Sequence, residues 1–352
     1  MKRIKRNPEK FEPIELYAAL ARDQGYNLNA PAHQTDFIVR VDRSIKAAAD
    51  NPALVHGKRV EAMFAHVAGG LGSCALIKQE DTGNVFAEDD ELQAPDYKII
   101  LKSGEQFFVE VKNCHFDKPT YLYLIAKEYD GKLQKYAELH RTPLKYAIFY
   151  SRWNKWALLP RDSFTEQANR YVTDMVNSLA RSEMLTLGDR MIGTKPDLVF
   201  ELRADPRKEA TLSQEGQAKF TIGDVRMYCD GMLITDAKEK SIAFYLMRFG
   251  DWIEGDTEGV FENEQLVGVR YVFNPQSFDS SQGFSVIGTL SSMISSAYSE
   301  LTVHENKVIA LDIRQNPEIF APEIPLDLKG TALPLWQFLI QPNTDPIERK
   351  VA

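Results

Sequence analysis

The 352-residue sequence has few cysteines and no long apolar run. Its three cysteines, Cys74, Cys114 and Cys229, are odd in number and lack CxxC spacing, which argues against a disulfide framework or a structural zinc site. No apolar run approaches the roughly eighteen residues of a membrane-spanning helix, so we expect no membrane partner. The basic N-terminus, "MKRIKRNPEKFEP", has no apolar segment behind it and does not read as a secretory signal. We therefore expect a reduced, cytoplasmic protein.

Several common catalytic motifs are absent as well. Neither GxGxxG nor GxxxxGK[ST] occurs, so the glycines at 69, 70 and 72 are interpreted as the end of a helix rather than a phosphate loop. No GxSxG or HExxH occurs, which leaves serine hydrolase and zinc protease functions without support. The net charge is −8, yet residues 112–161 carry ten Lys or Arg against four Asp or Glu. That segment is either a nucleic-acid-binding face or an ordinary solvated surface.

The order of predicted elements divides the chain into four parts. Residues 1–50 form an N-terminal appendage with a basic tip, a helix over 13–25 and an extended segment over 35–41. Residues 51–165 form a compact α/β domain, and residues 166–189 belong to a connecting helix predicted from the pattern over 161–185. Residues 190–352 form a β-rich C-terminal domain of unknown role. Its predicted strands include 196–205, 240–250 and 265–275, and a Ser-rich helix is expected over 289–301.

The 51–165 domain opens with a helix after Pro52. Its buried stripe is marked by apolar residues at i, i+3, i+4 and i+7, namely Val60, Met63, Phe64 and Val67. A hairpin with a Ser-Gly turn follows over 96–112. The remaining elements are a helix over 126–142 and strands over 145–153 and 155–160.

The hairpin combines core-like apolar residues with three charged ones. Residues two apart on a strand share a face, so Glu110 and Lys112 lie on the same side. Pairing across the turn places Asp96 opposite Glu110, Val111 or Lys112, depending on turn length. Two carboxylates and an ammonium group then converge. Such a set suits Mg²⁺, with Mn²⁺ able to substitute, because Mg²⁺ prefers oxygen ligands and takes only one or two carboxylates. A lysine beside it can orient a water molecule and neutralise charge on a phosphate.

Pro95-Asp96, thirteen intervening residues and then Glu110-Val111-Lys112 resemble the PD-(D/E)xK nuclease superfamily over about residues 50–165. The resemblance implies a restriction-endonuclease-like αβββαβ core. It implies that Asp96 and Glu110 bind the metal, together with Glu61 from the preceding helix and the Val111 position, and that Lys112 assists the attacking water. Asp96, Glu110, Lys112 and Glu61 form the expected catalytic set. Gln134 resembles a glutamine that some subfamilies use near the site.

The function expected from these residues is a Mg²⁺-dependent endonuclease that hydrolyses phosphodiester bonds, in DNA rather than RNA, in restriction, phage (antiviral) defence or repair. Phosphate contacts are expected from Lys118, Lys132, Gln134 and Lys135. The aromatic residues that interleave with these lysines either stack on bases or belong to the core: Tyr121, Tyr123, Tyr129, Tyr136, Trp153 and Trp156. The C-terminal domain could mediate a homodimer or bind a partner protein. The alternatives are a non-catalytic, nuclease-like module that binds nucleic acid or a partner subunit, and, for Glu110 and Lys112, a simple cross-strand ion pair.

Overall fold

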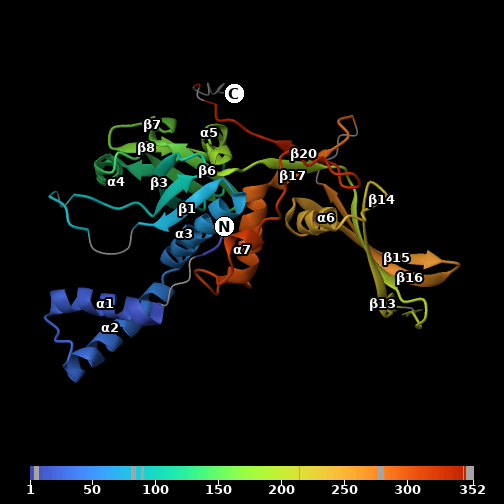
Figure 1. Cartoon of the computed structure of the whole chain (residues 1–352), viewed down its shortest axis with the longest axis horizontal. Helices are drawn as coiled ribbons and strands as arrows, with labels where there is room; N and C mark the ends of the chain where they lie inside the picture. Colours follow the sequence, from blue (N-terminus) through green and yellow to red (C-terminus); the bar gives the residue numbers. More distant parts are fainter. Residues whose placement is uncertain are drawn as a thin grey trace.

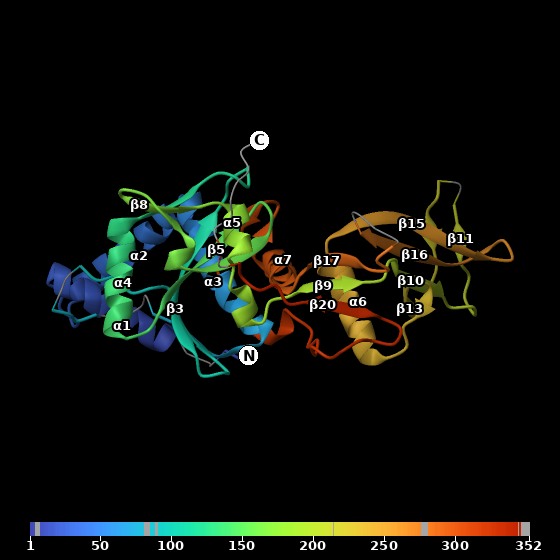
Figure 2. The same cartoon turned by 90° about the horizontal axis from the view of Figure 1, so that it is seen from above.

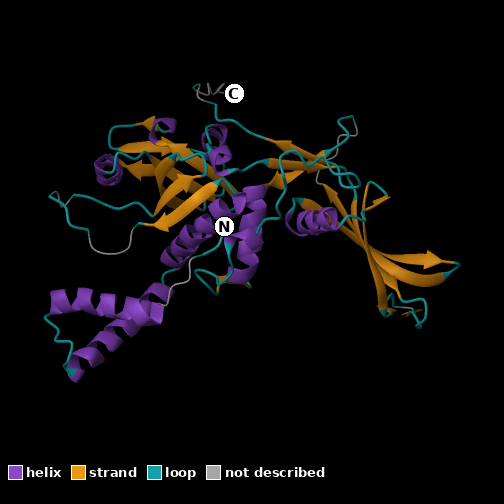
Figure 3. Ribbon diagram, in the orientation of Figure 1, coloured by secondary structure: helices purple, strands orange, loops and turns teal. Residues whose placement is uncertain are grey.

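The computed structural model describes residues 1–3, 8–80, 85–88, 91–213, 215–275, 281–343 and 345. Helices and several separate sheets make up a mixed α/β protein (Figure 3). Residues 4–7 of the predicted basic tip lie outside the described residues. None of the helices described is long and apolar enough to cross a membrane.

The first sheet contains five strands in the order β1-β2-β3-β5-β6, with β3 and β5 parallel and the other pairs antiparallel (Figure 1). The elements of this part of the chain are α3 (Pro52–Leu71), β1 (Cys74–Gln79), β2 (Tyr97–Leu101), β3 (Gln106–Cys114), β4 (Tyr123–Ala126), α4 (Lys127–Leu139), β5 (Leu144–Tyr150) and β6 (Lys155–Pro160). The predicted helix, hairpin, second helix and two strands are therefore confirmed as elements.

The alternation of side chains along β3 fixes which helix covers which face of this sheet. Val109 and Val111 belong to the core that also contains Phe64 of α3. Phe108 belongs to a second core, with Leu133 of α4. Because successive strand residues point to opposite faces, α3 and α4 lie on opposite sides of the hairpin.

The rest of the chain forms further sheets and helices (Figure 2). A second five-stranded sheet has the order β14-β13-β10-β16-β15, and a three-stranded sheet has the order β17-β9-β20. The strands are β7 (Thr165–Glu166), β8 (Arg170–Thr173), β9 (Met191–Thr194), β10 (Leu198–Ala204), β11 (Thr211–Leu212), β12 (Ala218–Lys219), β13 (Ile222–Cys229), β14 (Met232–Leu233), β15 (Trp252–Glu262), β16 (Gln265–Pro275), β17 (Ser285–Thr289), β18 (Val303–His304), β19 (Lys307–Val308) and β20 (Leu335–Phe338). The helices are α1 (Pro8–Gln24), α2 (Pro31–Ala49), α5 (Met175–Ala180), α6 (Ala237–Phe249) and α7 (Leu290–Thr302), with 3-10 turns at Arg161–Ser163, Met184–Leu187 and Pro317–Ile319.

The predicted Ser-rich helix is present as α7, and it lies beside α3 (Figure 1). Trp156 of β6 donates its indole N–H to Ser295 Oγ at 2.9 Å, and Arg59 of α3 donates to Thr302 Oγ1 at 3.0 Å. One core contains side chains from α3, β3, β6 and α7. The division of the chain at residue 190 stays a prediction, but α7 completes the layer that covers the first sheet.

Of the glycines at 69, 70 and 72, expected to end the helix that begins after Pro52, two lie inside α3 instead. A side chain on Gly69 would place its Cβ 2.7 Å from Pro317 Cβ, and one on Gly70 would lie 3.1 Å from Ile294 Cδ1. These glycines allow the Pro317–Ile319 turn and α7 to approach α3 closely. Gly72, with φ of 91°, is the residue that ends the helix.

The extended segment predicted over 35–41 is wrong, because these residues belong to α2. The β-branched run "FIVRV" favours a strand locally. Helix-spaced ion pairs favour the opposite outcome, with Arg40 contacting Asp36 and Lys46 contacting Asp42, both at 2.8 Å. None of the residues of α2 is buried.

Two predictions in the second half of the chain are also wrong. The connecting helix, predicted for residues 166–189 from the pattern over 161–185, is replaced by a 3-10 turn, the β7–β8 hairpin and the short helix α5. The strand over 240–250 is helix α6, which Asp236 caps by accepting a hydrogen bond from Glu239 N at 2.9 Å. Aromatic and β-branched residues in "SIAFYLMRF" favour a strand locally, but Ile242 and Leu246, four residues apart, are buried together as a helix requires.

Candidate active site

The β2–β3 hairpin brings Asp96 to β3. Tyr97 pairs with Val109, so Asp96, one residue before β2, reaches the level of Glu110. Val111 N donates a hydrogen bond to Asp96 Oδ2 at 2.7 Å. Gly104, with φ of 91°, provides the left-handed position in the turn that sets this register. Both carboxylates are nearly covered, with exposed fractions of 8% for Asp96 and 4% for Glu110.

The proximity of these acids changes the acidity of Asp96. Burial first, and then the charge of Glu110, raise the pKa of Asp96 from 3.8 to about 8, and Glu61 adds to the effect. Desolvation and like charge both disfavour the ionised carboxylate. A pKa raised in this way is typical of functional sites, and a bound cation lowers it again because it stabilises the ionised carboxylates.

Lys112 contacts this pair through Glu110. Its Nζ donates to Glu110 Oε1 and to the hydroxyl of Tyr129, each at 2.8 Å. The same Nζ lies 4.4 Å from the centre of the Tyr129 ring. The predicted convergence of Asp96, Glu110 and Lys112 therefore exists as geometry, while the catalytic role of each remains a prediction.

Tyr129 is the residue of this site whose role the sequence did not reveal. It lies in the first turn of α4, and its hydroxyl donates to Glu110 Oε1 while accepting from Lys112. Burial and the charge of Glu110 raise the pKa of Tyr129, so its hydroxyl stays protonated. The sequence signal that could have found it is its place in the first turn of the helix that follows the hairpin.

A buried network behind Tyr129 fixes the start of α4. Asp130, 1% exposed, accepts a hydrogen bond from Tyr146 at 2.7 Å and pairs with Arg161 at 3.2 Å. Tyr146 belongs to β5, next to β3 in the sheet. The first turn of α4 is thus tied to the strand beside the one that carries Glu110 and Lys112.

Glu61 lies on α3 within electrostatic reach of Asp96. Its backbone carbonyl accepts a hydrogen bond from the Tyr97 hydroxyl at 3.1 Å, which fixes α3 against β2. The Glu61 side chain is 19% exposed and pairs with Lys58 at 2.6 Å. The structure therefore brings Glu61 to the edge of the carboxylate pair, where its predicted role remains untested.

The four residues expected to contact phosphates are not gathered at the carboxylates. Lys132 pairs with Glu128 at 2.9 Å, and Lys135 pairs with Glu91 at 3.2 Å. Gln134 contacts Asp130 at 3.5 Å, and Lys118 lies 5.5 Å from the centre of the Tyr121 ring. Lys132 and Lys135 lie on α4, and Lys118 lies in the β3–β4 loop. Contacts of these lysines with nucleic acid remain a prediction.

The carboxylate oxygens of Asp96 and Glu110 fit a hard cation that takes few ligands from the protein and the rest from water. Hydrogen bonds within the described residues reach only Oδ2 of Asp96 and only Oε1 of Glu110, so each carboxylate keeps a second oxygen for a ligand. Among the described residues, no group of three His, Cys, Asp or Glu side chains is placed to hold a metal ion. Two carboxylates completed by water suit Mg²⁺ and do not suit zinc.

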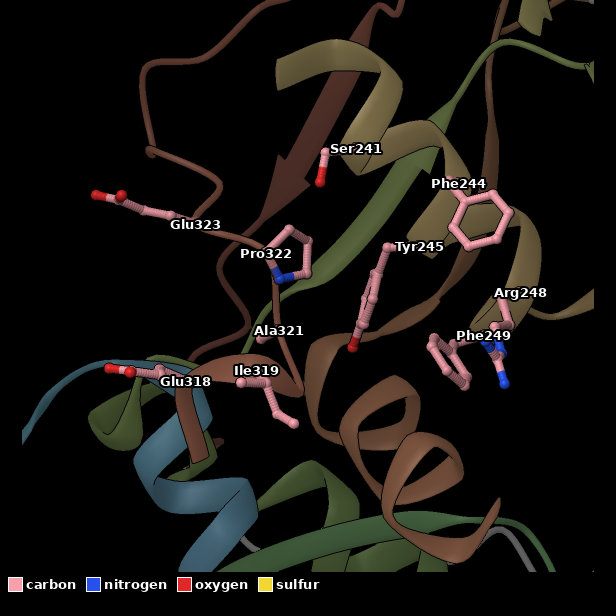
Figure 4. A pocket seen from close by; sticks show the side chains of 10 residues that line it. All are labelled: Ser241, Phe244, Tyr245, Arg248, Phe249, Glu318, Ile319, Ala321, Pro322 and Glu323. Carbon is pink, nitrogen blue, oxygen red and sulfur yellow. The ribbon is translucent and has the colours of Figure 1, made fainter. Parts of the chain in front are cut away.

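A pocket of about 400 Å³ lies elsewhere, between α6 and the Pro317–Ile319 turn (Figure 4). Phe244, Tyr245, Arg248 and Pro322 line it. The Tyr245 hydroxyl is buried without a hydrogen-bond partner in the part of the chain that the structure describes. None of the predicted site residues contributes to this pocket.

No family model matches the sequence, and no curated protein matches it. One solved structure with a similar arrangement is a Holliday junction resolvase from the hyperthermophilic archaeon Archaeoglobus fulgidus. The two chains are 13% identical, the match covers 30% of this chain and 80% of that one, and the TM-score is 0.23. A likeness of this size supports no conclusion, so the function below is argued from the site itself.

Proposed function

We propose that the protein is a metal-dependent nuclease that hydrolyses phosphodiester bonds in nucleic acid, with DNA favoured over RNA. One observation carries the proposal: two buried carboxylates and a lysine converge on one hairpin, with the pKa of Asp96 raised to about 8. Burial of two neighbouring carboxylates costs stability, and such an arrangement is typical of a site that binds a ligand. The hairpin and its flanking helices would form a restriction-endonuclease-like core, in a protein of restriction, phage defence or repair.

Asp96 and Glu110 would hold Mg²⁺, with Glu61 acting directly or through water and the Val111 carbonyl as a further ligand. When bound, such an ion lowers the pKa of water and polarises a phosphoryl oxygen. Lys112 would then orient the attacking water and offset charge that develops on the phosphate. Lys118, Lys132, Gln134 and Lys135 would contact the phosphates of the substrate strand.

Replacing Glu110 with alanine tests the proposal directly. We expect weaker Mg²⁺ binding by calorimetry and a sharp loss of plasmid cleavage, because one of two metal ligands is removed. Glu166→Ala is the matched control, since Glu166 is an exposed acid that pairs with Lys127 away from the hairpin. Wild-type cleavage should stop in EDTA. Binding of nucleic acid without any cleavage would instead support a non-catalytic module.

A second test concerns Tyr129. Tyr129→Phe removes only the hydroxyl that contacts both Lys112 and Glu110, so we expect Mg²⁺ affinity to be kept and kcat to fall by about tenfold. KM should change little, because Lys112 would lose its orientation rather than its charge. Tyr136→Phe is the control on the same helix, since the Tyr136 hydroxyl donates to Glu80 instead. Equal activity of the two variants would exclude a positioning role for Tyr129.

A further inference from the structure

The loop between β3 and β4, residues 115–122, is fixed to the candidate site at both ends. β3 ends at Cys114, two residues after Lys112. β4 leads directly into α4, whose third residue is Tyr129. The two ends of the loop therefore lie near Lys112 and Tyr129 of the candidate site.

A row of aromatic rings runs from the site to the surface of the loop. Phe116 lies 6.4 Å from Tyr123 and 6.1 Å from Tyr121, between ring centres. Burial is the main cause of the raised pKa of Tyr123, and the charge of Glu110 adds to it, so Tyr123 lies within electrostatic reach of Glu110. We call Tyr123, Phe116 and Tyr121, with Lys118 over the last ring, the aromatic row.

Exposure separates Tyr121 from the other aromatic residues of the basic segment. Trp156 and Tyr136 are buried, with exposed fractions of 3% and 8%. Tyr121 is 45% exposed, and its neighbour Leu122 is equally exposed. Of the aromatics considered for base stacking, Tyr121 thus combines exposure with a basic residue held against its ring.

Backbone contacts hold the loop in one shape. Tyr121 N donates to Lys118 O at 3.2 Å, and Met175 N donates to Pro119 O at 3.1 Å. His115 Nδ1 and Ser151 Oγ lie 2.7 Å apart, which ties the start of the loop to the end of β5. A ring presented on a fixed turn stacks with little loss of conformational freedom on binding.

We propose that Tyr121, Leu122 and Lys118 receive unpaired nucleobases next to the bond that is cut, so that the substrate is a nucleic acid with a single-stranded or branched segment. A base in an uninterrupted duplex offers no free face, because both faces stack on its neighbours. An unpaired base can stack on Tyr121 and pack on Leu122, while Lys118 contacts the adjacent phosphate. The inference deepens the proposed nuclease function and rests on it.

The test measures binding in EDTA, so that it does not depend on cleavage. Fluorescence anisotropy would compare a labelled single strand, a forked duplex and a blunt duplex of the same sequence. We expect Tyr121→Ala to weaken binding of the first two by about tenfold and to leave the blunt duplex unchanged. Tyr121→Phe should keep the affinity. Phe244→Ala, a similarly exposed aromatic on α6, is the matched control.

The salt dependence of binding separates the expected role of Lys118, a phosphate contact, from that of Tyr121, base stacking. Lys118→Ala should lower the salt dependence of single-strand binding by about one phosphate contact, whereas Tyr121→Ala should leave that slope unchanged. Equal losses on all three probes, no loss at all, or a wild-type protein that binds none of them would overturn the proposal. In the last case Tyr121 and Leu122 would belong to a protein-binding surface. If the EDTA results hold but no probe is cleaved with Mg²⁺, the nuclease function fails while this surface stands.

Discussion

Replacing Lys112 with alanine should lower the rate of cleavage by about a hundredfold or more while leaving Mg²⁺ bound. Asp96 and Glu110 both remain in this variant, so the expected metal ligands are intact. The lost ammonium group is the one that would orient the nucleophile and offset charge on the phosphate. Calorimetry with Mg²⁺ and cleavage of labelled DNA, measured on the same preparation, separate these two effects.

A plain ion pair predicts a different result for the same variant. The Lys112 side chain is 24% exposed and that of Glu110 only 5%. Removing the lysine therefore leaves a covered carboxylate without its partner and should cost more than the roughly 1 kcal/mol of a surface pair. Activity would then survive the substitution. Lys102→Ala, in the exposed turn of the same hairpin, controls for a general loss of positive charge. A fully active Lys112→Ala protein would end the nuclease assignment at this hairpin.

Asp96→Asn should stabilise the metal-free protein near neutral pH. The pKa of Asp96 is raised from 3.8 to about 8, chiefly by burial and then by Glu110. Because the folded pKa exceeds the unfolded one, the folded wild type binds more protons between about pH 4 and pH 8. Its free energy of unfolding should therefore fall as the pH rises through this range, by up to about 1.4 kcal/mol per pH unit.

Asparagine cannot ionise, so this variant should lose that part of the pH dependence and should bind Mg²⁺ poorly. Urea unfolding at several pH values, in EDTA, measures the slope directly. Asp117→Asn, in the exposed β3–β4 loop, should keep the wild-type slope. Parallel slopes for the wild type and Asp96→Asn would show that Asp96 is ionised in the folded protein over this range.

The candidate site was predictable where it depends on local rules. The alternation of residues along β3 placed Glu110 and Lys112 on one face, and the Ser-Gly turn brought Asp96 to them. Tyr129 could not be assigned a role in the same way. Its contact with both groups depends on how α4 docks on the sheet, and that docking is fixed by Tyr146 and Arg161 around Asp130.

The elements predicted wrongly are those in which local preference and tertiary packing disagree. Residues 35–41 and 240–250 contain the β-branched and aromatic residues of strands, yet ion pairs in α2 and a capped, buried face in α6 make them helical. The division near residue 190 was drawn from element order alone. Element order gives no sign that α7 packs against α3, since the two segments lie far apart in the sequence.

The contact between α3 and α7 has a consequence for synthesis of the chain on a ribosome. The hairpin that brings Asp96, Glu110 and Lys112 together leaves the exit tunnel well before α7, the helix that completes its covering layer. Until α7 arrives, Trp156 lacks the hydroxyl of Ser295 and the apolar face of α3 is open to solvent. The fold around the hairpin is therefore incomplete until α7 has been made, and a chain that terminates before α7 should be sensitive to proteolysis.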